Sequence, residues 1–213
     1  MITIPQVVEE IIQKQPFLID MINDGLINHS SLARKIKPEI EEKLFKSVQL
    51  GAVVMALKRF NKSKIKTNSP LPFKSPDLMV RSQLMEITVN AKSLERGDQL
   101  AKLHALANEK GLFFTITQGV VETTIITGLS LKNAIYKIIN KENVIASFEN
   151  LSAITIRLPK ETVSTSGSYF EILKYLAWEK INIIEVVSTY TEFTIIFQDK
   201  DVDRAFSVLK KKL

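Results

Sequence analysis

Hydrophobic positions between Ile4 and Phe60 recur every three to four residues, which is the spacing of one buried helix face. Pro5 suits a first helical turn, because a residue there needs no backbone N–H partner. Pro16 is expected to bend or divide the first helix, and Gly25 to end the helical segment. The first part of the chain is therefore predicted to be helical.

The same pattern predicts more helices further along. Asn28 and Ser30 are candidate caps of a short helix, and Pro38 stands where a new first turn can begin. Ser47 is expected to cap a last helix over 48–60. That helix is apolar nearly all round, which indicates burial on every side.

A change of composition separates this region from the rest of the chain. Residues 61–76, NKSKIKTNSPLPFKSP, contain three prolines and no regular hydrophobic period, as is typical of a linker. We predict a helical domain over 1–63, a linker over 64–76, and two further modules over 77–148 and 149–213.

The two modules are predicted from an internal repeat. At an offset of 70 residues and without a gap, Glu109–Thr127 aligns with Glu179–Phe197, and Leu103, Leu106 and Ala107 align with Leu173, Leu176 and Ala177. Chance explains so many identities in one window poorly, so we treat the segment as duplicated.

Each copy shows the same order of strand and helix patterns. The first copy is predicted to have strands at 85–89, 112–117, 120–127 and 144–148, with helices at 94–110 and 131–139. The second is predicted to have strands at 153–158, 182–189 and 192–198, with helices at 168–180 and 202–209, and no fourth strand. The order β-α-β-β-α-β is that of the ferredoxin-like split βαβ unit, so the fold class is α+β, with eight strands expected in the sheet.

These segments resemble the ACT domain family, and most closely the paired regulatory ACT domains of aspartate kinases. The resemblance covers about 77–213 and rests on the strand before the first helix, INI at 181–183, Ser188, and the acidic start of the last helix at Asp201 and Asp203. It implies amino-acid or similar effectors bound between two ACT modules, and sheets paired side by side in a homodimer. The missing fourth strand of the second copy leaves an edge that a second chain or the first copy has to cover.

The resemblance also places a candidate effector site in the second copy. Backbone amides of the turn Thr165–Ser168 can meet a carboxylate, and Asn182 and Ser188 would share one face of the following strand. The candidate residues are Thr165, Ser166, Gly167, Ser168, Asn182, Ile183 and Ser188. Alternatively, Asn182 only forms the turn after the helix. The turn PKETVSTSGSY has glycine only at Gly167, unlike the family's Asp-x-Pro-Gly type turn.

Charge distinguishes the two ends of the chain. Residues 1–75 hold 12 Lys and Arg against 7 Asp and Glu, which is +5 of the chain's +6. The segment LINHSSLARKIKPEIEEKLFKSVQLGAVVMALKRF resembles a helix-turn-helix unit of the winged kind. A DNA contact would use Arg34, Lys35, Gln49, Lys58, Arg59 and Lys62. The alternative is that these charges only solvate a buried apolar helix that serves dimerisation or docking.

Several kinds of chemistry have little support in the sequence. There is no cysteine, His29 and His104 have no acidic cluster beside them, and no glycine-rich phosphate loop of a kinase is present. Trp178 is expected in the core or at an interface. We therefore predict no catalytic residues, no metal and no cofactor, and a cytoplasmic chain without a membrane span.

The resulting hypothesis is a non-catalytic ligand-sensing regulator. An amino acid or similar metabolite would bind the ACT-like modules and change what the N-terminal helices contact, as in a transcriptional regulator. The alternative is a regulatory subunit that docks on an enzyme of amino-acid metabolism through 48–60, without DNA.

Overall fold

The computed structural model describes residues 2–23, 25–60, 76–91 and 97–213, and the chain divides into two compact units, Met1–Asn68 and Ser69–Leu213. Lys62 and all but the last residue of the linker predicted over 64–76 lie outside the described residues. Within the described residues, no helix combines the length and the apolar composition needed to cross a membrane.

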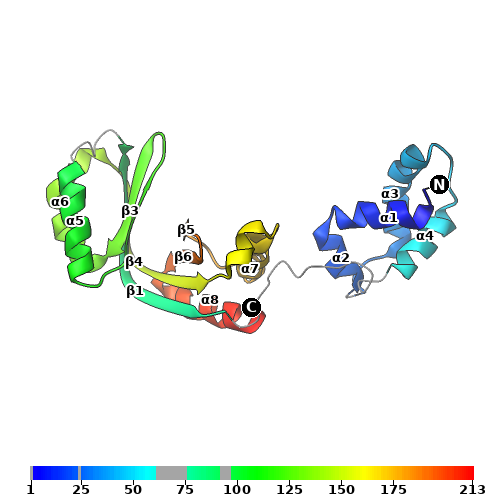
Figure 1. Ribbon diagram of the computed structural model, residues 1–213. Coiled ribbons are helices and arrows are strands. Elements are labelled where there is room, and N and C mark those ends of the chain that lie inside the picture. Colours follow the sequence, from blue (N-terminus) through cyan, green and yellow to red (C-terminus); the bar gives the residue numbers. More distant parts are fainter. Residues whose placement is uncertain (1, 24, 61–75, 92–96) are drawn as a thin grey trace. The chain divides into compact units, whose positions relative to one another are not determined.

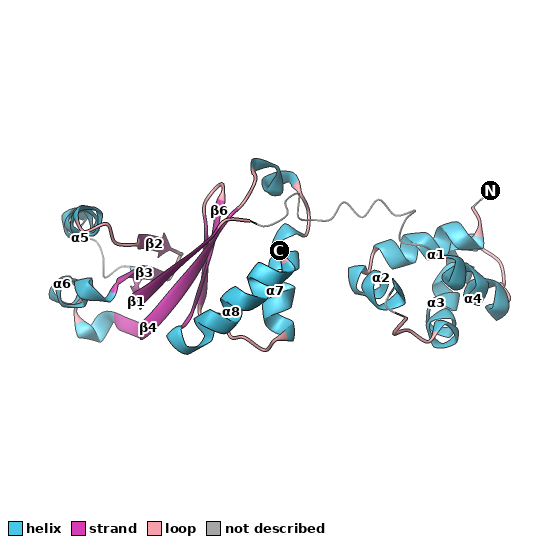
Figure 2. Ribbon diagram, turned by 90° about the horizontal axis from the view of Figure 1, so that it is seen from below, coloured by secondary structure: helices cyan, strands magenta, loops and turns pink. Residues whose placement is uncertain are grey.

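The first unit is a small helical bundle (Figure 2). Its helices are α1 (Ile4–Gln13), α2 (Pro16–Asn23), α3 (His29–Leu44) and α4 (Leu50–Arg59). Pro16 divides the first two, as the sequence predicts, and Gly25 follows α2 with a left-handed φ of 69°. One cluster of buried aliphatic side chains from α1 to α4 forms the core, including Ile11, Ile40 and Leu57.

Helix α3 differs from the prediction, because it is one helix that runs through Pro38. Its start is fixed by Asn28, whose side-chain oxygen accepts hydrogen bonds from the N–H groups of Ser30 (3.0 Å) and Ser31 (3.1 Å). Ile36 and Ile40 are buried on either side of the proline. Burial of this face offsets the hydrogen bond that proline cannot donate.

The entry to α4 also differs from the prediction. Gln49 occupies the N-cap position, and the Ser47 hydroxyl instead donates to the Glu41 carboxylate at 3.2 Å. The same carboxylate accepts the Val48 N–H at 2.9 Å. This backbone hydrogen bond is the largest of the causes that lower the pKa of Glu41. Glu41 therefore joins α3 to the start of α4.

The expectation that α4 is buried on every side is wrong. Val53, Ala56 and Leu57 are buried in the helical core, whereas Ala52 and Met55 are exposed. One face of α4 is buried and the opposite face is exposed, although the sequence is apolar nearly all round. Its outer face is therefore a surface of the unit.

The second unit is built on one six-stranded antiparallel sheet (Figure 1). Its strands are β1 (Leu78–Asn90), β2 (Phe114–Gln118), β3 (Glu122–Gly128), β4 (Val144–Arg157), β5 (Glu185–Ser188) and β6 (Glu192–Gln198). The order across the sheet is β2-β3-β1-β4-β6-β5. The prediction of eight strands is wrong, because the strands predicted at 144–148 and 153–158 are one strand, β4, of 14 residues, and β1, with 13 residues, serves both halves.

Strands β1 and β4 belong to both halves of the sheet. The second part of β1 pairs with β3 and with the start of β4, and its first part pairs with the end of β4, where Leu78 faces Ile156. The first part of β1 thus supplies the fourth strand that the second repeat lacks. Gln83 on β1 and Asn150 on β4 have left-handed φ angles of 58° and 54°, and the β1–β4 register shifts near these positions.

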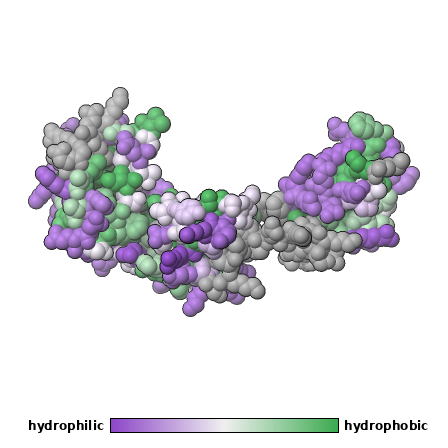
Figure 3. All heavy atoms as spheres, in the orientation of Figure 1, coloured by the Kyte–Doolittle hydropathy of each residue, from purple (hydrophilic) through white to green (hydrophobic). Residues whose placement is uncertain are grey.

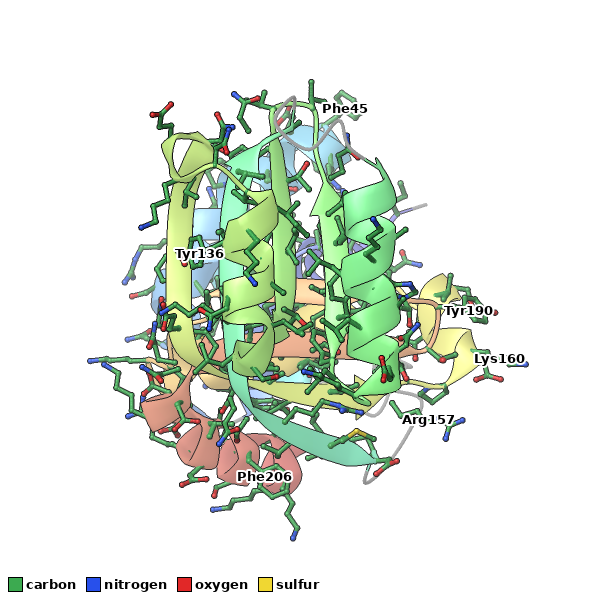
Figure 4. The ribbon with its side chains drawn as sticks, turned by 90° about the vertical axis from the view of Figure 1, so that its left-hand side faces the viewer. Phe45, Tyr136, Arg157, Lys160, Tyr190 and Phe206 are labelled. Atoms are coloured by element: carbon green, nitrogen blue, oxygen red, sulfur yellow. The ribbon has the colours of Figure 1, made fainter. Side chains whose placement is uncertain are left out.

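Helices cover one face of each half. They are α5 (Gly97–Glu109), α6 (Lys132–Ile138), α7 (Ser168–Trp178) and α8 (Asp199–Lys212). Helices α5 and α6 pack on Met85, Ile87 and Val89 of β1, and Figure 4 shows both helices in front of the strands. Tyr136 of α6 lies beside β4, where its hydroxyl is 3.2 Å from the Ser147 Oγ. Helices α7 and α8 cover a second core built on β4 and β6.

A third cluster lies on the sheet face that the helices leave uncovered. It contains Leu84 and Ile126 from the first half and Leu151, Ala153 and Ile196 from the second, with Phe113, Ile184 and Val187 packed against it. In Figure 1, α5 and α6 lie on one outer side of the bent sheet and α7 on the other, with β3 and β5–β6 between them. The two uncovered faces therefore turn toward each other around this cluster, which we call the inner cluster.

Candidate functional site

The turn predicted to bind an effector precedes α7. Gly167 has a φ of 83° and is the N-cap residue of α7. The Thr165 hydroxyl donates to the carbonyl oxygen of Glu161 and the Ser168 hydroxyl to that of Thr165, both at 2.8 Å. These hydroxyls hold the turn in place.

The structure brings only some of the predicted residues together. Ser188 lies directly opposite Phe193, whose ring stacks on Tyr169 in the first turn of α7, with ring centroids 4.7 Å apart. Ser188 is therefore at the same end of α7 as Thr165–Ser168. Asn182 and Ile183 follow the other end of this 11-residue helix, which is about 16 Å long at 1.5 Å per residue.

Asn182 is also outside the strand that the sequence assigns to it. Strand β5 begins at Glu185, so strand alternation does not place Asn182 on the face of Ser188. The repeat shifts by one residue here: the N–H of Leu112 bonds the carbonyl of Ala107, and the N–H of Ile181 bonds that of Leu176. Ile181 is thus the counterpart of Leu112. Asn182, which is exposed, forms part of the connection after α7.

A pocket of about 250 Å³ lies where β1 bends, and the sequence gives no signal for it. It is lined by Arg81, Ser82, Gln83, Leu84, Gly111, Leu112, Phe113, Gly128, Leu129 and Ser130. Three segments that are distant in sequence meet there: the bend of β1, the turn after α5, and the end of β3. The pocket forms because β3 ends opposite Leu84, so the first part of β1 continues without that neighbour.

The pocket combines one cationic side chain with hydroxyl groups and an apolar wall. Arg81 is exposed, and none of the described carboxylates forms an ion pair with it. Ser82 and Ser130 supply hydroxyls, and Leu84 and Phe113 supply apolar surface. A guanidinium group binds carboxylates through paired hydrogen bonds, so the lining suits a small ligand with a carboxylate and an apolar part.

A buried acid, Glu86, is a second feature that the sequence analysis missed. Glu86 lies in the middle of β1, is 5% exposed, and has a buried oxygen, Oε2, without a hydrogen-bond partner among the described residues. Burial and the negative charge of Glu185 raise the pKa of Glu86 to about 7. In the sequence, Glu86 stands within MEITV, where strand alternation makes a polar residue look solvent-facing.

The predicted nucleic-acid residues lie on the surface of the helical unit. Arg34, Lys35, Gln49, Lys58 and Arg59 are all exposed, and the sixth, Lys62, is outside the described residues. Arg34 Nη2 donates to the Ser31 Oγ at 3.3 Å. On α4, Lys58 and Arg59 are exposed like Ala52 and Met55 before them.

Two further features bear on the chemistry of the chain. Among the described residues, no group of three or more His, Asp or Glu side chains is arranged to hold a metal ion. Trp178 was expected in the core or at an interface; it is 59% exposed, so it is not in the core, and a place at an interface stays a prediction. Its ring meets Tyr175 edge-on at 5.7 Å, and the Lys174 ammonium lies 5.6 Å from its centroid.

The second unit has an α+β fold in which helices cover a six-stranded antiparallel sheet, and known structures share it. A Clostridium acetobutylicum aspartate kinase, described as an allosteric enzyme, superposes with a TM-score of 0.52 at 14% identity, over 67% of this chain and 36% of that one. A structure of aspartokinase alpha and beta subunits gives 0.50 at 16% identity, over 65% and 98%. The match thus spans about a third of the kinase. No family model and no curated protein sequence matches the chain.

Proposed function

We propose that this chain is a non-catalytic, ligand-sensing regulator that binds an amino acid or similar small metabolite on its sheet unit. The observation that carries the proposal is the pocket at the β1 bend, which is lined by Arg81, by residues with hydroxyl groups and by apolar residues. The fold shared with an aspartate kinase described as an allosteric enzyme supports the same class of function, and so does the sequence resemblance to ACT domains.

The pocket suits a metabolite rather than a large ligand. Its volume of about 250 Å³ is below the 300–1,000 Å³ typical of sites for drug-sized molecules. A ligand carboxylate would pair with Arg81, and an apolar side chain would contact Leu84 and Phe113. Because the pocket joins the β1 bend to the turn after α5, a bound ligand would hold these segments together.

The turn before α7 is a second possible place for the effector. Thr165–Ser168 and Ser188 lie at one end of α7, and ACT-like modules would bind a ligand there against a neighbouring module. Asn182 and Ile183 lie at the other end, so they would contribute only through a second chain.

Thermal-shift measurements against the twenty amino acids test the proposal and separate the two places. A ligand that binds only the folded state raises the melting temperature. With the pocket as the site, Arg81→Gln abolishes the shift and Ser188→Ala leaves it unchanged; the reverse result assigns the effector to the turn. If no amino acid shifts the wild-type protein, the proposed function is wrong.

DNA contact by the helical unit is a second proposed function. It is favoured by the outer face of α4, which presents Gln49 at one end and Lys58 and Arg59 at the other, without an acidic residue on the helix. Cations that neutralise phosphates release counterions, and this makes the affinity depend on salt. Ligand binding to the sheet unit would then be coupled to DNA binding, as in a transcriptional regulator.

Titration with duplex DNA at several salt concentrations tests this second function. We expect Lys58→Gln with Arg59→Gln to lower the salt slope by about two units, since each lost phosphate contact removes about one. The matched control is Lys210→Gln with Lys211→Gln on α8, which removes the same charge from the sheet unit. Equal slopes for both variants would show that only net charge acts.

Docking on an enzyme is the competing role of the same surface. Val53, Ala56 and Leu57 face the helical core, so a partner would meet Met55 and Phe45, which are 47% and 94% exposed. Phe45 has a φ of 51°, a left-handed conformation that costs a non-glycine residue free energy. Loss of a co-purifying enzyme from a Phe45→Ala, Met55→Ala variant, without DNA binding by wild type, would support docking.

A homodimer is also proposed, although the reason differs from the sequence prediction. The edge predicted to be open is covered by β1 within the chain, so the free edges are β2 and β5. Exposed strand edges are sites of pairing with another chain. Figure 3 shows hydrophobic side chains at the tip of the β2–β3 hairpin, where Val120 and Val121 are exposed. A monomeric mass by light scattering across low micromolar concentrations would exclude the dimer.

A further inference from the structure

Glu86 points to the inner cluster rather than to solvent or to the helices. Its neighbours on β1, Met85 and Ile87, belong to the core under α5 and α6, so strand alternation turns Glu86 to the opposite face. Its direct partner on β3 is Ile126, a member of the inner cluster. The carboxyl group therefore lies at the margin of a buried apolar cluster that no helix covers.

A second carboxylate approaches the same cluster from the other half of the sheet. Glu185 on β5 lies opposite Ile196, which is also a member of the inner cluster. Its chain neighbours Ile184 and Val187 pack against that cluster. The Glu185 Oε1 accepts the Val186 N–H at 2.9 Å, and this bond orients its carboxylate. Two acids about 100 residues apart in sequence thus border one apolar surface.

Neither carboxylate of this pair has a positively charged partner among the described residues. No described basic side chain forms an ion pair or hydrogen bond with either carboxylate, and Glu86 Oε2 is both buried and unpartnered. Proteins rarely keep a buried acid without a partner, because the charged form loses its hydration. Around Glu86, the facing residues on β3 and β4 are Ile126 and Phe148, which carry no charge.

We propose that Glu86 and Glu185 bind the positively charged nitrogen of a small organic ammonium or guanidinium compound, whose carbon chain lies on the partly exposed side chains that border the inner cluster. Such a cation brings N–H donors for the unpartnered oxygen and a charge that offsets both acids. Its carbon chain would contact Ile184 and Val187, which are partly exposed and pack against the inner cluster. A hard divalent cation fits less well, because two carboxylates give fewer oxygen ligands than it takes. The site uses neither Arg81 nor the hydroxyl groups of its pocket.

Binding to this site is linked to the proton on Glu86. Burial and Glu185 raise the pKa of Glu86 to about 7, so the acid is largely neutral at pH 6 and largely ionised at pH 8. The ligand binds the ionised form, so its affinity increases about tenfold over that interval, and binding below pH 7 releases a proton. Alkylammonium probes keep their charge throughout, since their pKa resembles that of lysine.

Titration of the full chain with n-butylammonium, followed by the carbon resonance of the Glu86 carboxyl group, tests the proposal. We expect saturable binding that is about tenfold tighter at pH 8 than at pH 6. Glu86→Gln, which keeps the side-chain shape, should weaken binding at least tenfold and remove its pH dependence. Glu185→Gln should weaken it less and lower the pH at which binding improves. Glu122→Gln, an exposed acid on β3, is the matched control and should bind like wild type.

Several outcomes would overturn the proposal. They are the absence of saturable binding to wild type, equal binding to Glu86→Gln, an equal response to neutral n-butanol, and the same response to sodium chloride at matched ionic strength. Circular dichroism shows whether each variant is folded, and Glu185→Gln gives a second independent variant. If the Glu86 signal follows protein concentration instead of the probe, a side chain of a second copy fills the site and the small-ligand proposal is wrong.

Discussion

The two halves of the sheet have one plan and differ at a few positions that carry polar chemistry. Ile125 and Ile195 are equivalent in the repeat and fully buried, each beneath its own pair of helices. Opposite the equivalent residues Ile126 and Ile196, however, the first half has Glu86 and the second has Ala153. The aliphatic framework is the same in both halves, whereas the acids stand at different positions: Glu86 is on β1 in the first half, and Glu185 is on the edge strand of the second half, where the first half has Thr115.

The end of the first helix shows a second difference. Helices α5 and α7 both end in a Schellman motif, with a left-handed residue followed by an N–H bonded five residues back. That residue is Gly111 (φ 61°) in the first half and Lys180 (φ 55°) in the second. Glycine adopts this conformation without the steric cost that lysine has.

The largest expected effect tests whether the two halves unfold together. Ile125→Ala and Ile195→Ala each leave a cavity in one core, and each should lower the free energy of unfolding by about 2–5 kcal/mol. Trp178, the only tryptophan, lies in the second half. Because β1 and β4 are shared, Ile125→Ala should shift the urea transition of Trp178 fluorescence as far as Ile195→Ala does. An unshifted transition would show that the halves are independent.

A smaller effect is expected when Glu86 is replaced by a neutral residue, since its counterpart in the second half, Ala153, carries no charge. Since folding raises the pKa of Glu86 to about 7, the folded state holds the proton better than the unfolded state, whose pKa is about 4.3. Wild-type stability should therefore decrease as the pH rises from about 4 to 7 and stay lower above that range.

Glu86→Gln removes this dependence, so it should raise the free energy of unfolding at pH 8 by about 1–3 kcal/mol. At pH 4 both proteins should have nearly the same stability. Urea denaturation across this pH range measures the difference, with Glu122→Gln as the control. A variant that is less stable than wild type at pH 8 would mean that the Glu86 charge has a partner.

Substitutions at the two helix ends are expected to change the free energy of unfolding by about 1 kcal/mol, in opposite directions. Lys180→Gly removes the strain of a left-handed lysine and should stabilise the fold, while Gly111→Ala introduces strain and should destabilise it. No atom lies within 4 Å of a Cβ added at Gly111, so the conformation alone causes this cost. Thermal unfolding of both variants measures the pair, and changes of equal sign would contradict the equivalence of the two positions.

The helical unit allows the same comparison, with the smallest expected effect. Gly25 and Phe45 occupy left-handed positions at the ends of α2 and α3, each followed by a five-residue hydrogen bond. Phe45→Gly should stabilise residues 1–68 by up to about 1 kcal/mol, since the exposed ring has little packing to lose. If the same variant binds DNA or a partner protein more weakly, Phe45 is kept for binding.

Local patterns predicted the elements better than they predicted how these elements join. Burial imposes periodicity, so the order of strands and helices in the repeat could be predicted from residues such as Ile125 and Ile195. The extension of β1 could not, because residues 79–83 are exposed and carry no core pattern. The continuity of β4 could not either, because the polar residues Glu149 and Asn150 separate the strands predicted at 144–148 and 153–158. Pro38 was predicted to begin a helix because local preference favours that position, whereas burial of Ile36 and Ile40 sustains one helix through it.

The candidate sites depend on features that sequence alone does not show. The one-residue shift between the repeats occurs in a turn, so an ungapped alignment placed Asn182 opposite Leu112. The pocket beside Arg81 arises where three distant segments meet, and no local pattern encodes such a meeting. Glu86 looked solvent-facing in its strand, because the inner cluster that buries it contains residues from the other half of the sheet.

The sharing of β1 and β4 also determines when the sheet can form during synthesis. The residues paired between their middle parts, Leu84 and Leu151, are about 70 positions apart, and loops of this length close slowly because of their entropy. The contacts of the helical unit are local, so this unit can fold before β4 and β6 have emerged from the ribosome to complete the sheet. Until then, the apolar side chains of β1 depend on chaperones or on the antiparallel neighbour β3 for protection.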